Sequence, residues 1–418
     1  MEENTQEIKN RGWQVTFAGL GINLALGVLY TWGVIKTAIP EAWNWSDTDK
    51  TLPYSIATLV FAFMTVPAGR LQDKIGPRWI ALAGGICVGV GMILASQFTT
   101  PLGFVLCFGL LTGAGIGMGY ACATPPAVKW FPANRTGLIA GLVVSGFGLA
   151  AAWISPLARE LNKSFGLQTT MMIFGIAFLV IVSTLSQLLR NPPPGWKPQS
   201  PPAAPGAAKP KPATEDFTWS EMLRTPQFWL LWFMYAFAAG AGLMIIPQIA
   251  TIVKDQAHNT NGFVFIALLA VGNASGRILS GALSDKIGRK ATMLIAFIAQ
   301  AAILFSLRYV TQDSLFYPIA ILIGMNFGAN LALFPAVTKD FFGLKNFGVN
   351  YGFVFTAWGV GGFVLSQISS RVYDAAKAGG GGGNYYLAYL IAGGALILSA
   401  ALAFALRAPK PKAPPAAA

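Results

Sequence analysis

Twelve long apolar segments dominate the chain, and they constrain its fold more than any other feature. They cover residues 13–35, 53–71, 79–98, 101–124, 136–157, 168–189, 226–250, 260–283, 291–309, 315–338, 348–371 and 384–406. One helical crossing of a bilayer takes about 20 mostly apolar residues, and inside lipid only helices and closed barrels satisfy the backbone. With 54% hydrophobic and 11% charged residues, a chain of 418 residues cannot hide its apolar surface from water. We therefore predict an all-α integral membrane protein with twelve transmembrane helices.

A stretch rich in proline, alanine and lysine separates these segments into two sets of six. It reads NPPPGWKPQSPPAAPGAAKPKPATED from Asn191 onward, a composition typical of an extended, solvated linker. The predicted organisation is a six-helix bundle at 1–190, a cytoplasmic linker at 191–225, a second six-helix bundle at 226–407 and a disordered tail at 408–418.

The basic residues are distributed unevenly over the two faces of the predicted bundles. Of the 29 Lys and Arg, 20 fall in the loops and ends assigned to one face and 8 in those of the other. The positive-inside rule makes the first face cytoplasmic, so we expect a multi-pass protein of the plasma (inner) membrane with both termini in the cytoplasm. The net charge of +13 follows from this topology and does not indicate a nucleic-acid partner.

The sequence lacks the residue clusters that an enzyme, a metal centre or a bound cofactor needs. Cys87, Cys107 and Cys122 lie inside apolar segments without metal-ligand spacing, and the single histidine, His258, lies outside them. We therefore predict no catalytic residue, no metal and no cofactor.

A short charged motif occurs twice at equivalent places in the two halves. Residues 69–78 read GRLQDKIGPR and residues 281–290 read GALSDKIGRK, each directly after the second apolar segment of its set. Such duplication is typical of transporters built from two repeated bundles. The motif resembles the signature of the major facilitator superfamily, and the resemblance implies that four residues brace and gate the cytoplasmic face: Asp73, Arg78, Asp285 and Arg289. The alternative is a basic turn that serves only topology.

Arg277 is a charged residue well inside a predicted span. A charge near the centre of a spanning helix costs about 2.5–3.5 kcal/mol, and the sequence places no Asp or Glu within any span to pair with it. A guanidinium can bind a carboxylate through two parallel hydrogen bonds, so a small carboxylate is the simplest visiting partner. Asn273 lies one turn earlier on the same face and can bond beside it. The alternatives are an arginine that braces the bundle or reaches its interface, and an asparagine that bonds a neighbouring helix.

Five further motifs carry a closer resemblance. They are GVLYTW at 27–32, GAGIGMGYACATPPAVKWFP at 113–132, MLRTPQFW at 222–229, NASGR at 273–277 and NYGFVFTAWG at 350–359. In this order they are similar to the oxalate/formate antiporter and monocarboxylate transporter branch of that superfamily, including bacterial lactate transporters. The resemblance implies that the central cavity is lined by Arg277, Tyr120, Tyr30, Phe327, Leu331 and Phe355. Asn273, beside Arg277, and Leu29, in the expected apolar wall, complete the predicted substrate-binding set. For its aromatic and leucine members, plain core packing is the alternative.

The chain departs from that branch at three positions. Oxalate-type members carry a second cation where this chain has Trp358, so a single interior cation favours a monoanion. Proton-coupled animal members carry a lysine near the position of Leu29 and an aspartate at that of Asn273. Neither usual proton carrier is present, which leaves Asp255 as the candidate for proton coupling, with a solvated loop acid as the alternative.

Together these features predict a secondary transporter that moves a small monocarboxylate of the lactate or pyruvate kind with a proton, by alternating access. Its partners are the monocarboxylate, the proton and the lipid bilayer, and it is expected to work as a monomer. Two alternatives remain open at this stage. One is an anion exchanger of the oxalate/formate type, and the other is a membrane-embedded sensor that transports nothing.

Overall fold

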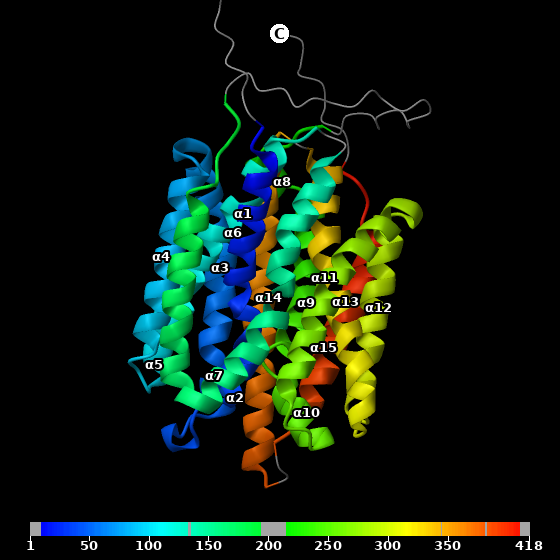
Figure 1. The fold of residues 1–418 in the computed structure, drawn as a ribbon. Helices are drawn as coiled ribbons and strands as arrows, with labels where there is room; N and C mark the ends of the chain where they lie inside the picture. The colour runs from blue at the N-terminus through cyan, green and yellow to red at the C-terminus, as the bar shows by residue number, and fades with distance from the viewer. Residues whose placement is uncertain (1–9, 133–134, 194–214, 344, 381–382, 410–418) are drawn as a thin grey trace, which may run out of the picture.

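The structure, a computed structural model, describes residues 10–132, 135–193, 215–343, 345–380 and 383–409. Within these ranges every regular element is a helix, and the long helices lie side by side along one direction (Figure 1). Most of the predicted tail and most of the predicted linker fall outside the described residues. We call the described helices before residue 194 the first half and those after residue 214 the second half.

The first half runs from α1 to α7. Its elements are α1 (Gly12–Leu26), η1 (Gly27–Thr31), α2 (Trp32–Thr37), η2 (Glu41–Trp43), α3 (Asp47–Ile75), α4 (Pro77–Ala95), α5 (Pro101–Phe104), the π-helical η3 (Val105–Thr112), α6 (Gly113–Lys129) and α7 (Thr136–Ser186). The elements α1, η1 and α2 together form one span, and α5, η3 and α6 form another.

The second half runs from α8 to α15. Its elements are α8 (Trp219–Leu223), α9 (Pro226–Ile245), α10 (Ile249–Ala257), α11 (Gly262–Ile287), α12 (Arg289–Leu307), α13 (Asp313–Phe342), α14 (Phe347–Ala378) and α15 (Tyr386–Ala405). Helix α8 begins within the stretch expected to be extended. A capping box explains it, because the Thr218 side chain accepts from the Glu221 amide while the Glu221 carboxylate accepts from the Thr218 amide.

Eleven helical stretches in the described part of the chain are long and apolar enough to cross a membrane. The difference from twelve arises at α7, which contains the predicted segment 136–157 and most of the segment 168–189. Its course breaks at Gly166, whose φ of 76° and ψ of 169° are not helical. Glycine adopts a positive φ without the strain of a side chain, so the chain reverses there and α7 supplies two crossings.

Large apolar side chains cover the outside of the bundle. Leu138 is 68% exposed, Ile278 66% and Phe404 65%, and many other leucine, isoleucine and phenylalanine side chains are similarly exposed. Such a continuous apolar exterior is far beyond what a monomer in water shows. It is the surface expected of helices that face lipid.

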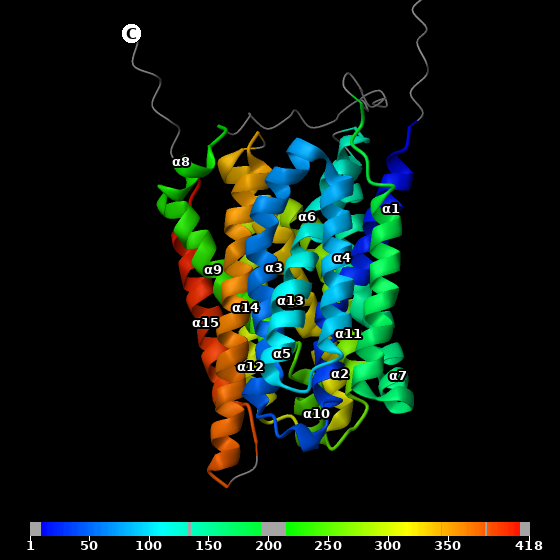
Figure 2. The same cartoon turned by 90° about the vertical axis from the view of Figure 1, so that its left-hand side faces the viewer.

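The two ends of the bundle differ in the elements they carry. Helix α8 lies at one end, the upper one in Figures 1 and 2, whereas α2 and α10 lie together at the other. We call these the α8 end and the α10 end. The predicted cytoplasmic face corresponds to the α8 end.

Candidate substrate-binding site

Close glycine contacts fix the position of helix α11 against α13. A Cβ atom added at Gly276 would collide with the Met325 carbonyl oxygen, and one added at Gly328 would collide with the Asn273 carbonyl oxygen. Only glycine allows two helix backbones to approach so closely. Because Asn273 and Arg277 project from this tightly packed part of α11, their positions are set by backbone contacts.

Arg277 is buried in the interior of the bundle, with 8% of its surface exposed. Its Nε donates to the Asn273 Oδ1 at 3.1 Å, and its Nη1 donates to the Val144 carbonyl oxygen of α7 at 2.8 Å. The guanidinium also lies over Gly148, where an added Cβ would be 3.6 Å from Cζ and from Nε. Arg277 therefore spans from the second half of the chain to the first.

Both partners of the guanidinium are neutral. No carboxylate of the described residues lies within ion-pair distance of Arg277, although ion pairs form elsewhere in the molecule. An arginine side chain has five N–H donors, and the two observed bonds leave three of them for another partner. The Asn273 Nδ2 is likewise a buried donor without a partner among the described residues. The site thus offers donors and a positive charge, which is suitable for an anion.

Two tyrosine hydroxyls share this region. The Arg277 charge acts on the hydroxyls of both Tyr30 in η1 and Tyr120 in α6. Both tyrosines come from the first half, whereas Arg277 and Asn273 come from the second. The predicted polar members of the binding set are therefore close to one another at the junction of the halves.

Aromatic rings surround the same junction. The Tyr30 ring lies 5.8 Å from that of Phe327, and the Tyr120 ring stacks 6.0 Å from that of Phe355, so each tyrosine of the first half meets a phenylalanine of the second. These distances are typical of favourable aromatic pairs. Trp358 continues this stack at 5.1 Å from Phe355.

Sequence reasoning missed two rings of this cluster. Phe147 lies 5.0 Å from Tyr30 and 5.4 Å from Tyr120, and Phe61 lies 5.2 Å from Tyr120. Phe147 had no local signal, because the proximity of its neighbour Gly148 to Arg277 appears only in the folded chain. No local pattern distinguished Phe61 from Phe63, the other phenylalanine of its apolar segment.

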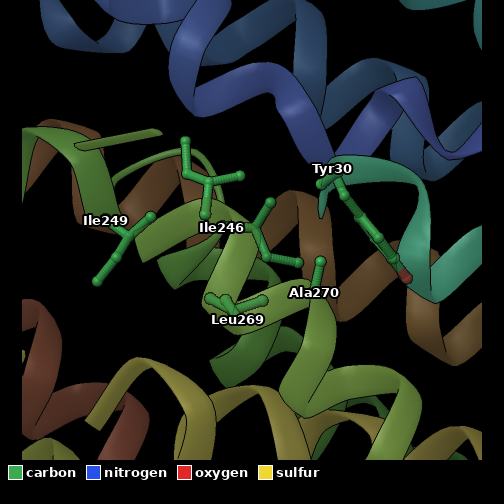
Figure 3. A pocket seen from close by; sticks show the side chains of 7 residues that line it. Tyr30, Ile246, Ile249, Leu269 and Ala270 are labelled. Atoms are coloured by element: carbon green, nitrogen blue, oxygen red, sulfur yellow. The ribbon is translucent and has the colours of Figure 1, made fainter. Parts of the chain in front are cut away.

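A small apolar pocket adjoins the site at Tyr30. Figure 3 shows Ile246, Ile249, Leu269 and Ala270 around it, with the Tyr30 side chain extending along one side. Its walls come from both halves, because Tyr30 and Ala151 belong to the first and the other lining residues to the second.

Leu29 and Leu331, the two predicted aliphatic members of the binding set, are both buried in the core. Neither lines the pocket of Figure 3.

The duplicated charged motif lies apart from this site, at the α8 end. Arg289 pairs with Asp285 at 2.7 Å and with Asp340 at 3.1 Å. In the first half the equivalent acid, Asp73, approaches Lys129 at 3.8 Å, while Arg78 lies over the Trp79 ring at 4.9 Å.

Asp255 lies at the α10 end. Its carboxylate accepts a hydrogen bond of 2.9 Å from the Tyr373 hydroxyl, although much of the side chain is exposed. Partial desolvation raises the pKa of the Asp255 carboxyl, while the Tyr373 bond and the Lys254 charge act in the opposite direction. An acid of raised pKa can take up a proton at a higher pH than an ordinary aspartate.

The described residues contain no group of three or more His, Cys, Asp or Glu side chains that could hold a metal ion. The donors of Arg277 and Asn273 offer hydrogen bonds and a positive charge to a solute between two halves of a helical bundle. This arrangement defines a membrane transporter.

Comparison with known protein families identifies the superfamily to which the chain belongs. The chain belongs to the Major Facilitator Superfamily, whose family model matches residues 12–366. It is a transporter of this superfamily and not an enzyme. The superfamily resemblance carried by the duplicated charged motif is thereby confirmed.

Several curated relatives are similar over most of their length. The uncharacterized MFS-type transporter YhjX of Escherichia coli is 28% identical over 84% of this chain and 85% of its own. The oxalate:formate antiporter of Oxalobacter formigenes is 27% identical over 85% and 83%. Monocarboxylate transporter 13 of Rattus norvegicus is 24% identical over 93% and 88%.

Solved structures share the fold at lower identity. A bacterial homolog of the human lysosomal transporter Spinster, in an inward-facing and unoccupied conformation, has a TM-score of 0.68 at 17% identity, covering 96% of this chain and 97% of its own. A mutant of the nucleoside transporter NupG has a TM-score of 0.69 at 15% identity, covering 95% and 100%.

Proposed function

We propose that this transporter carries a small monocarboxylate of the lactate or pyruvate kind together with a proton, by alternating access. The observation that carries the proposal is the buried Arg277 guanidinium, whose partners among the described residues are neutral and use two of its five donors. A visiting carboxylate would accept two parallel hydrogen bonds from it and cancel its charge. Relatives named for oxalate, formate and monocarboxylates support an organic anion as the substrate.

The surroundings of Arg277 favour a single negative charge. Trp358, at the place where a second cation is expected for oxalate, is fully buried and stacks on Phe355. A dicarboxylate would bring one uncompensated charge into an apolar cage, which is costly. The rings of Phe327 and Phe355, with Leu29 and Leu331, would instead contact a methyl group or a short chain.

Coupling to a proton balances the charge of the cycle. Moving a lone anion inward against an inside-negative potential costs about 2.3 kcal/mol per 100 mV, whereas an anion with a proton crosses without net charge. Asp255 is the proposed proton relay at the α10 end, which we assign to the outside. The α8 end, with both termini, would face the cytoplasm of the plasma (inner) membrane, and Asp73, Arg78, Asp285 and Arg289 would brace that face in a functional monomer.

Uptake of labelled lactate into vesicles that contain the purified transporter tests this proposal. We expect an inward proton gradient to increase the initial rate several-fold over that at equal pH. Uptake that ignores the proton gradient but requires an anion inside the vesicles would instead establish exchange, the function for which the 27% identical oxalate:formate antiporter is named. Vesicles with the Arg277→Gln variant provide the background.

A further inference from the structure

Several polar contacts between the described parts of the two halves lie at the α10 end. There Arg159 donates to Asn261 at 3.0 Å, and Gln367 donates to Ser55 at 3.0 Å. Two larger sets of contacts lie at the same end, around Asp374 and around Lys36. At the α8 end, by contrast, a cation–π contact joins the halves, since the Arg70 guanidinium lies over the Trp219 ring at 5.8 Å.

The first set joins a carboxylate of the second half to a helix start of the first. The Asp374 carboxylate of α14 accepts from the backbone amides of Asp47 and Thr48 at 2.8 and 2.9 Å, and from the Thr48 hydroxyl at 2.6 Å. These amides are the first of α3, so Asp374 caps that helix from the opposite half. An acid at a helix start is stabilised by the unpaired amides and the helix dipole.

In the second set, an ion pair of the first half lies between polar side chains of the second half. Lys36 of α2 pairs with Asp47 at 2.6 Å, and both side chains are almost fully buried. The Lys36 ammonium also donates to the Gln248 side chain, which accepts from the Tyr385 hydroxyl at 2.8 Å. The Tyr385 hydroxyl lies 3.3 Å from the Asp47 carboxylate as well.

Gln248 anchors this second set in the second half. Its amide nitrogen, Nε2, has two N–H donors and lies within hydrogen-bond distance of three hydroxyls, those of Ser369 and Ser370 at 3.2 and 3.0 Å and that of Thr51 of the first half at 3.3 Å. The residue lies at the break between α9 and α10, where the chain leaves the helical course of the seventh predicted span. Buried polar networks of this kind are strong when every member is bonded.

We propose that these two sets of contacts form the gate that closes the α10 end during the transport cycle. The Asp374 cap and the bonds from the Lys36–Asp47 pair to Gln248 and Tyr385 hold the halves together there, and the release of these contacts opens the path to Arg277 from that side. The ion pair between Lys36 and Asp47 stays intact when the halves separate, because both residues belong to the first half. The opening therefore breaks the bonds to Asp374, Gln248 and Tyr385 without leaving a lone buried charge. The gate proposal requires only that the chain is a transporter of this superfamily, and it does not depend on which anion the protein carries.

A cysteine at the interface reports the opening without any substrate. Ile246 is buried, and its carbonyl oxygen lies 2.9 Å from an added Cβ at Gly33 of the first half, so parting of the halves uncovers this position. The reporter is Ile246→Cys in a chain whose three native cysteines are replaced by serine. A membrane-impermeant maleimide is applied to the α10 side of oriented vesicles, and the labelling rate is measured.

Asp374→Ala is expected to raise this labelling rate about tenfold, and the matched control Asp49→Ala to leave it unchanged. Asp49 accepts from the Ser46 amide at the same helix start but entirely within the first half. Tyr385→Phe removes one hydroxyl and no ring, and should raise the rate about threefold. Its control, Tyr389→Phe, loses a bond to Gln256 that lies within the second half.

Labelling of both gate variants at the parent rate would overturn the proposal, as would equal increases in the gate variants and their controls. If Asp374→Ala fails to fold, Tyr385→Phe decides the question alone. The result is independent of the proposed function, since a wrong substrate assignment would leave the labelling rates unaffected.

Discussion

Replacing Arg277 by glutamine is the most direct perturbation of the proposed site. The variant keeps a polar side chain beside Asn273 but loses the charge and the paired donors. The Arg277 Nε and one Nη1 proton are already used, so a carboxylate is expected to accept two of the three remaining donors. A hydrogen bond to a charged group contributes about 1.5–3 kcal/mol, and two such bonds at the lower bound contribute about 3 kcal/mol. Because about 1.4 kcal/mol corresponds to a tenfold change, we expect Kd to rise at least about 100-fold.

Isothermal titration of the detergent-purified protein with lactate measures this change. The matched control is Arg289→Gln, which removes a cation at the α8 end that is paired with Asp285 and Asp340 and should leave Kd unaltered. In the absence of ligand, the Tm of the Arg277→Gln variant should be no lower than that of the parent, because burying a charge without a counterion is itself costly. An unchanged Kd in a folded Arg277→Gln variant would refute the role assigned to this guanidinium.

Four further predictions concern the packing, the coupling and the selectivity. Gly148→Leu should fill the space beneath the guanidinium and weaken lactate binding about tenfold by titration, whereas Gly141→Leu, which has open space, should not. Gly328→Ala should lower Tm by several degrees, because its Cβ would collide with a backbone carbonyl, and Gly281→Ala, with no close neighbour, should leave Tm unchanged. Because the pKa of the Asp255 carboxyl is raised, this carboxyl keeps its proton up to a higher pH than a free aspartate does. Asparagine cannot take up and release that proton, so Asp255→Asn should make lactate uptake insensitive to the proton gradient. Oxalate should compete with lactate at least about tenfold more weakly than pyruvate does, and equal competition would contradict the single-charge argument.

The number and order of the spans follow from the sequence, because hydrophobic length is a local property of the chain. The twelve apolar segments correspond to the eleven spanning helices once α7 is divided at Gly166. The π-helical course of η3 was beyond prediction, because it occurs within continuous apolar sequence and depends on tertiary packing. The break between α9 and α10 falls at Pro247 and Gln248, and a proline inside an apolar segment is a local signal for such a break.

The candidate site was predictable to the extent that charge inside a membrane is exceptional. Arg277 stands out on that ground alone, and Asn273 follows from its place one turn earlier on the same helix face. The structure brings the hydroxyls of Tyr30 and Tyr120 within electrostatic reach of Arg277. The backbone partner, the Val144 carbonyl, was not predictable because every residue has a carbonyl group. The buried Lys36 was also missed, since it lies at the end of its apolar segment and its partner Asp47 belongs to the next helix.

The bond from Arg277 to the Val144 carbonyl acts as a strut between the two bundles. It ties α11 to α7, and therefore the second half to the first. In the proposed cycle, a carboxylate bound to the same guanidinium would compete with that carbonyl and weaken the tie. The tie would stay in place when no carboxylate is bound, so the return of the empty carrier would be the slower half of the symport cycle. The side chain proposed to bind the substrate would then also limit the overall turnover rate.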